Sequence, residues 1–423
     1  MQKISCRRWI HVIAGAVMAC AGTLAAAQVA TMSSTPTQDR PTPRTLALYQ
    51  VLTDQVHGKG AFFGQQFASW QGHEGRLPAF GSDIQAGLHA LGSPSDHPAL
   101  FGWNVETWLR GSPQLKMALQ DRLVQTDRKG GINALHWPMA NFLIECHPGP
   151  CTDNDNAPGV DPIALIATHA WVKVPYSQNE FADATQLFDA QVDQLADFIK
   201  QLRTPDGQLL PLLVRPFHEM NHPSAGAEAH WWAGRYPAQF AWVFRRFVDG
   251  LRLRHGLNNL LFVYAPSGRH LFDRAEPDPS LAYARYWPEP EDAPLSTHRR
   301  YVDVAAFDHY LKDDEPASQF FDAIRVTYAF AQSPRRGVAR VSAIAECGPK
   351  DGMGSTPFWS ARLLPGLQAN QGALWRQFAY MMTWSNGPEN FSTYPGAPRA
   401  VAEDFRDWFN DPATLFLDEV PAH

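Results

Sequence analysis

The chain has 423 residues, which is enough for one large domain or two ordinary ones. Apolar residues make up 45% and charged residues 18%, a balance that excludes a disordered chain. The formal net charge is −6, so we expect no binding to nucleic acid or to an anionic membrane surface.

The N-terminus has the pattern of an export signal. Basic residues precede a short apolar run, and residues 25–27 are small alanines suited to cleavage. The run is too short to favour a transmembrane helix. We therefore predict a signal peptide over residues 1–27, a flexible leader over 28–44, and a secreted or periplasmic protein, with lipidation of Cys20 as an open alternative.

Eight short apolar runs along the chain are typical of buried strands, and they fall at 61–67, 100–105, 132–137, 209–217, 259–265, 302–307, 341–345 and 378–384. Helical patterns lie between them, most clearly over 188–202 and 240–251. The alternation predicts an α/β fold, a (β/α)8 TIM barrel that forms a single domain over 45–423. Residues 141–176 and 266–300 are expected to be long βα loops. A doubly wound sheet is the alternative fold.

The segment LLVRPFHEMNH at residues 212–222 contains the H-E-x-x-H pattern of zinc peptidases. In those enzymes both histidines lie on one helix and face the metal. Here the motif follows a strand-like run, and Pro223 directly follows His222, where that helix would have to continue. A zinc peptidase therefore remains only an alternative, and we predict no metal ligands and no cofactor. The acidic segment TDNDN at residues 152–156 is expected to be a solvated loop, with a bound calcium ion as the open alternative.

The glutamate of the same motif suggests a different chemistry. Glu219 ends the fourth predicted strand and Glu346 ends the seventh, and barrel enzymes carry their catalytic groups at these strand ends. Two carboxyl groups that flank a bond are the machinery of glycoside hydrolysis: one protonates the leaving oxygen and the other attacks the anomeric carbon. Arg215 either pairs with a carboxylate at the base of the site or locks the barrel strands, and the second role is favoured.

Five segments together resemble glycoside hydrolase family 26: RPFHEMN, HWWAG, HGLNNLLFVYAPSG, YVDVAAFDHY and AIAECG. This family contains retaining β-mannanases built on a (β/α)8 barrel. The resemblance implies that Glu219 is the general acid/base and Glu346 the nucleophile. It also implies that His218 forms hydrogen bonds within the active site and that Tyr310 donates its hydroxyl group to the nucleophile. Glu219 would then need a raised pKa.

The resemblance further implies a set of substrate-binding side chains. Trp384 is expected to form the platform under the reacting sugar, with Trp231 or Trp232 at the neighbouring position. Trp137 and Asn221 complete the set. For each tryptophan, plain packing in the core is the open alternative.

Two departures from the family pattern concern the substrate. Many relatives run directly from HEMNG into WFWWG, whereas here HPSAGAEAH separates Asn221 from Trp231. Many also end the third strand with a histidine where this chain has Pro138, and His136 is expected to point the other way. We predict an endo-acting retaining glycosidase of β-1,4-mannan or another mannose-containing polysaccharide. Action on β-1,3-xylan, mixed-linkage glucan or a bacterial exopolysaccharide, and a non-catalytic carbohydrate-binding barrel, are the alternatives.

Cysteines and partners complete the expectations. In an oxidising compartment Cys146 and Cys151 close the small loop CHPGPC as a disulfide, with two free thiols as the alternative, and Cys347 is left alone. A polysaccharide is the expected partner, and the protein is expected to be a monomer.

Overall fold

The computed structural model describes residues 35–38, 40–223, 229–273, 276–289, 300–333, 340–354 and 356–423. The predicted signal peptide and Cys20 lie outside these residues. Within the described part of the chain, no helix is both long and apolar enough to cross a membrane.

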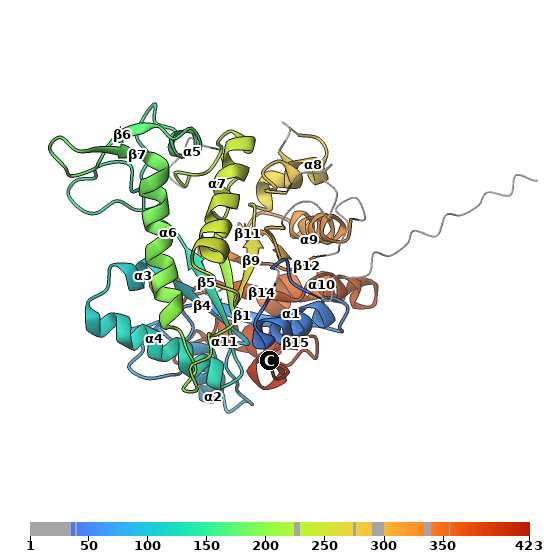
Figure 1. Ribbon diagram of the computed structural model, residues 1–423. Coiled ribbons are helices and arrows are strands. Elements are labelled where there is room, and N and C mark those ends of the chain that lie inside the picture. The colour runs from blue at the N-terminus through green and yellow to red at the C-terminus, as the bar shows by residue number, and fades with distance from the viewer. Residues whose placement is uncertain are drawn as a thin grey trace, which may run out of the picture.

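Eight parallel strands follow one another around a barrel, and each pairs with its neighbour in the chain (Figure 1). These strands are β1 (Ala61–Gln66), β4 (Leu100–Asn104), β5 (Ile132–Trp137), β8 (Leu212–Pro216), β9 (Leu260–Tyr264), β10 (Val304–Ala305), β12 (Val341–Ser342) and β14 (Tyr380–Thr383). The Ile344 amide donates to the Tyr380 carbonyl at 2.9 Å, which joins the seventh strand to the eighth. The predicted (β/α)8 barrel is confirmed.

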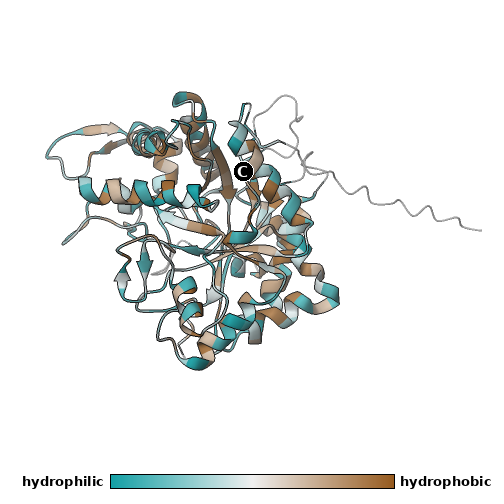
Figure 2. Cartoon of the chain, turned by 90° about the horizontal axis from the view of Figure 1, so that it is seen from below, coloured by the Kyte–Doolittle hydropathy of each residue, from teal (hydrophilic) through white to brown (hydrophobic). Residues whose placement is uncertain are grey.

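Helices surround the barrel, and Figure 2 shows polar and apolar residues on different faces of many of them. They are α1 (Pro43–Val56), α2 (Asp83–Ala90), α3 (Val105–Leu109), α4 (Pro113–Arg128), α5 (Pro162–Ala167), α6 (Ala184–Gln201), α7 (Pro237–Asp249), α8 (Pro279–Ala284), α9 (Ser318–Ala331), α10 (Leu364–Gly372) and α11 (Arg399–Phe409). Helices α6 and α7 confirm the two clearest helical patterns. Most of these helices bury an apolar stripe against the strands in one shared core, whereas the buried side chains of α1 pack with those of the barrel interior.

Short strands outside the barrel extend its loops, and they are β2 (Gln71–Gly72), β3 (Gly75–Arg76), β6 (Trp171–Lys173), β7 (Phe181–Asp183), β11 (Asp308–Leu311), β13 (Glu346–Pro349) and β15 (Thr414–Leu415). The long loop after β5 contains α5 and the β6–β7 hairpin, which projects from one end of the molecule (Figure 1). Strands β11 and β13 pair with each other beyond the ends of β10 and β12.

Alternate residues of each barrel strand enter two different cores. On β5, Ile132 and Ala134 belong to the barrel interior, whereas Leu135 and Trp137 belong to the layer between the strands and the helices. This alternation follows from the two-residue period of a strand. It places His136 on the interior side, which decides its role below.

The ordered domain begins before the predicted boundary at residue 45. The Thr37 amide donates to Asp303 Oδ1 at 2.6 Å. Thr42 caps helix α1, and Pro43 occupies its first turn. The last part of the predicted leader is therefore folded onto the barrel, because it carries the start signals of a helix.

Phe63→Ala tests the core between barrel and helices. The Phe63 side chain is 0% exposed, and its ring centroid lies 5.2 Å from that of Trp359 and 5.6 Å from that of Phe405. The substitution should lower the free energy of unfolding by about 3–5 kcal/mol in denaturant titrations. Phe181→Ala is the matched control, because Phe181 is 54% exposed. Equal losses in the two variants would contradict this view of the core.

Candidate active site

Strand β8 ends in a strained turn that carries Glu219. Phe217 and Glu219 have positive φ angles of 48° and 52°, a left-handed conformation that is costly for residues other than glycine. The Phe217 ring packs against Trp231 and Trp232. The Glu219 amide donates to the Ala265 carbonyl at 2.8 Å. Packing and this hydrogen bond hold the turn and leave Glu219 partly exposed at the carboxyl end of the strand.

The same turn excludes the zinc-peptidase alternative. Residues 218–221 form a turn and not a helix, and the His222 amide donates to the Glu219 carbonyl at 2.9 Å. The His222 ring packs against His270 with centroids 4.6 Å apart. A zincin needs its two histidines one helical turn apart on one face, and this backbone does not provide that arrangement.

Glu346 begins β13 and is held by two donors. Tyr310 donates its hydroxyl to Glu346 Oε2 at 2.9 Å, and Arg215 Nη2 donates to Oε1. Arg215 Nη1 also donates to Asp308 Oδ2 at 2.6 Å. Arg215, Asp308 and Glu346 are all buried. Arg215 was expected mainly to lock the barrel strands. Its guanidinium instead bridges two carboxylates of the site, which corresponds to the other predicted role, pairing with a carboxylate at the base of the site.

The burial of these charges shifts their pKa values. Burial raises the pKa of Glu219; the nearby His230 lowers it, and the charge of Glu346 raises it further. Burial also raises the pKa of Asp308 well above its ordinary value, against the attraction of Arg215. Burial alone would lower the pKa of Arg215, but Asp308 and Glu346 raise it. The raised pKa keeps Glu219 protonated over a wider pH range, as a proton donor requires.

Three histidines line one side of this cluster. His218 Nδ1 lies 3.3 Å from His136 Nε2, and the His218 ring centroid lies 4.2 Å from that of His230. Burial lowers the pKa of both His136 and His218 well below the ordinary value, so both are neutral near pH 7. The expectation that His136 points away from the site was wrong, because its strand position faces the barrel interior.

Trp384 follows β14 and is the partly exposed tryptophan of the set. Its ring meets those of His136 and Phe67 edge-on, each with centroids 5.8 Å apart. These contacts fix the indole beside the histidines while part of its surface stays accessible. An exposed indole face is suited to contact with the apolar face of a sugar ring.

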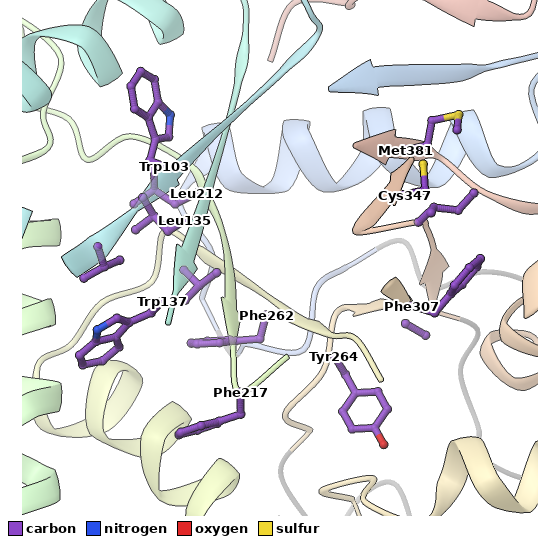
Figure 3. Packing of buried hydrophobic residues seen from close by; sticks show 14 of the residues in the cluster. Trp103, Leu135, Trp137, Leu212, Phe217, Phe262, Tyr264, Phe307, Cys347 and Met381 are labelled. Atoms are coloured by element: carbon purple, nitrogen blue, oxygen red, sulfur yellow. The ribbon is translucent and has the colours of Figure 1, made fainter. Parts of the chain in front are cut away.

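Three other predicted substrate-binding tryptophans are buried. Trp137 is 1% exposed, and Trp231 and Trp232 are 0% exposed. Figure 3 shows Trp137 among the buried residues next to a helix, and its ring lies 6.0 Å from that of Phe247. Their indole N–H groups donate, in that order, to Glu106 Oε1, the Met139 carbonyl and the His218 carbonyl. The prediction that they contact substrate was wrong, because they fill the layer between strands and helices.

Asn221 joins two loops of the barrel end. Its Nδ2 donates to the Ser267 carbonyl at 2.9 Å, and its Oδ1 accepts from the Ser267 amide at 2.7 Å. The side chain predicted to bind substrate thus connects the turn after β8 to the loop after β9. Its direct effect is to position the segment that carries Glu219.

The predicted disulfide between Cys146 and Cys151 is present, with the Cα atoms 5.2 Å apart. It closes a small loop within the long segment between β5 and α6. Cys347 is free and buried, and burial raises the pKa of its thiol well above the ordinary value. It follows Glu346 directly in the chain and packs in the core between strands and helices.

Residues 41–345 match the profile of glycosyl hydrolase family 26. The chain therefore belongs to that family of carbohydrate-active proteins.

Two curated relatives are mannan endo-1,4-β-mannosidases. The protein from Bifidobacterium adolescentis is 27% identical over 384 residues, which cover 84% of this chain and 32% of the relative. The one from Thermothelomyces thermophilus is 27% identical over 223 residues, which cover 52% and 39% of the two chains. The chain thus spans well under half the length of these relatives.

Solved structures share the fold. An endo-β-1,4-mannanase double mutant from Cellulomonas fimi superposes with a TM-score of 0.71 at 24% identity, over 93% of this chain and 79% of that one. A β-mannanase of the same family from Bacteroides ovatus gives 0.68 at 22% identity, over 90% and 97%. At this identity the likeness supports the (β/α)8 architecture alone.

Glu219→Gln tests the raised pKa of Glu219. In the folded state the pKa of the Glu219 carboxyl group lies above its ordinary value of 4.5. Between these two pKa values the folded state binds more protons than the unfolded chain, so its stability falls as the pH rises. Each unit of difference is worth about 1.4 kcal/mol. The neutral amide should therefore raise the free energy of unfolding at about pH 7.5 and change it little at about pH 4.

The control for this experiment is Glu74→Gln, because Glu74 is exposed. Denaturant titrations at both pH values should show no comparable gain for the control. A loss of stability in Glu219→Gln at the higher pH would contradict the assigned shift.

Proposed function

We propose that the chain is an endo-acting, retaining glycosidase that cleaves β-1,4-mannan. The observation that carries this proposal is a pair of differently held carboxyl groups at the ends of the fourth and seventh barrel strands. Glu219 has a raised pKa and partial exposure, whereas Glu346 is fixed by two donors. Family membership supports the reaction class, and the names of the two curated relatives support mannan as the substrate.

The proposed reaction is a double displacement. In the first step the Glu346 carboxylate bonds to the anomeric carbon, while Glu219 gives its proton to the glycosidic oxygen as that C–O bond breaks. In the second step Glu219 takes a proton from water, and the resulting oxygen nucleophile releases the sugar from Glu346 with retained configuration. Two glutamates and water account for every bond and proton.

The surrounding residues have positioning roles in this scheme. Tyr310 and Arg215 each bind one oxygen of Glu346, which directs a lone pair of the carboxylate and stabilises its charge. Trp384 offers the accessible indole on which the reacting sugar would stack. His218 precedes Glu219 on the strained turn, so its contact with His136 helps to fix the acid/base.

We also propose export across a membrane and action as a monomer on a polysaccharide. The basic start, short apolar run and alanine-rich end of residues 1–27 support export. The disulfide between Cys146 and Cys151 supports an oxidising compartment.

The proposal is tested by release of reducing ends from a panel of glycans. The panel holds galactomannan, glucomannan, β-1,3-xylan, mixed-linkage glucan and a bacterial exopolysaccharide. The wild-type protein should act on the mannans, and Glu219→Ala and Glu346→Ala should each lower kcat by about 1,000-fold or more, because each removes a group that acts only in the transition state.

An activated aryl β-mannoside separates the two roles. Its leaving group needs no proton, so Glu219→Ala should retain formation of the covalent intermediate, seen as a burst of released phenol, whereas Glu346→Ala should show none. Activity on a glycan other than mannan, with none on the mannans, would overturn the assignment of mannan as the substrate. Full activity in either alanine variant would overturn the mechanism.

A further inference from the structure

Asp153, His218 and His230 form a compact group of metal-ligating side chains next to the candidate active site. Each offers one ligand atom, and the three atoms lie within 4.8 Å of one another. His230 Nδ1 lies 2.9 Å from Asp153 Oδ2. Zn²⁺ binds histidine nitrogen and carboxylate oxygen at about 2.0–2.2 Å in a tetrahedron, which sets its ligand atoms about 3–3.5 Å apart. Small side-chain movements therefore bring all three atoms to one ion.

The group is held from several sides. His218 and His230 are 7% and 8% exposed. Trp232 stacks on His230 with ring centroids 4.7 Å apart and 12° between the planes, and its Nε1 donates to the His218 carbonyl at 2.8 Å. The Trp231 amide donates to the Asp153 carbonyl at 2.9 Å, which fixes the backbone of the third residue. Side chains that are already in place lose little entropy on binding an ion.

The outer contacts match those of a metal site. His218 Nδ1 faces His136 Nε2 at 3.3 Å, so Nε2 of His218 is the nitrogen left for an ion. Metal-ligating histidines commonly use their second nitrogen in such a hydrogen bond, which fixes tautomer and ring orientation.

We propose that Asp153, His218 and His230 bind one divalent transition-metal ion. Zn²⁺ accepts two imidazoles and one carboxylate with water as the fourth ligand, and it is the ion used as the probe below. The set contains the first histidine of the H-E-x-x-H motif but not His222, so it differs from a peptidase site. It also draws on the loop after β5, which brings Asp153 to the end of β8. This proposal concerns binding of the ion and does not depend on the proposed glycosidase function.

The test is a Zn²⁺ titration of the full chain after removal of metal with a chelator. Isothermal calorimetry, or competition with a chromogenic chelator, should give one ion per chain with micromolar or tighter affinity. Asp153→Asn and His230→Ala should each weaken binding at least 10-fold, because each removes one of three ligands. Saturating Zn²⁺ should raise the Tm of the wild type and not that of the two variants.

His222→Ala is the matched control, because it removes a histidine of the same motif that is not part of the group. It should bind Zn²⁺ as the wild type does. Asp153→Asn preserves side-chain shape at a partly exposed position, so it decides the case if His230→Ala does not fold. Absence of saturable binding in the wild type, unchanged affinity in Asp153→Asn, or loss of binding in His222→Ala would overturn the proposal.

Discussion

The guanidinium of Arg215 is the interaction on which the rest of the site depends. It lies buried at the base of the site and bridges Glu346 and Asp308. A buried carboxylate without a partner is costly, and removing one partner of a buried ion pair typically costs about 3–5 kcal/mol. One cation here serves two buried carboxyl groups, and Glu219 is a third nearby. Burial disfavours ionisation of Glu219, and the charge of Glu346 adds to this effect.

The barrel makes this arrangement possible. Arg215, Asp308 and Glu346 lie far apart in the sequence and come from the fourth, sixth and seventh strand regions. Parallel strands in a closed barrel bring their carboxyl ends to one face. The strained turn after β8 then places Glu219 near the ion pairs, and the aromatic residues around Phe217 support the turn. Trp231 and Trp232 are therefore part of the core and also support the turn that carries Glu219.

Much of this could be predicted from the sequence, because the signals are local. Continuous apolar runs mark buried parallel strands, and a carboxylate within two residues after such a run marks a strand end, which identifies Glu219 and Glu346. The spacing of apolar residues likewise identifies α6 and α7. These features depend on the chain within a few residues of each position.

The remaining features depend on which side of each strand faces inward. On β5 the sequence alternation does not say whether His136 or Trp137 enters the barrel. The sequence therefore predicts Trp137 at the substrate and His136 pointing away from it, and the structure reverses both. The small Ala134, two residues before His136, is a usable signal, since interior positions near the site are small or polar. The meeting of Asp153 with His230 joins two loops, and no local pattern contains that information.

We propose that Glu346, held by Arg215 and Tyr310, attacks the anomeric carbon. The most direct measurement is mass spectrometry of the protein after reaction with an activated 2-deoxy-2-fluoro-β-mannoside, which slows breakdown of a glycosyl-enzyme. We expect one added fluorosugar per chain, located by peptide mapping on Glu346. A label on another residue, or turnover of an activated substrate with inverted configuration and no covalent species, would contradict it.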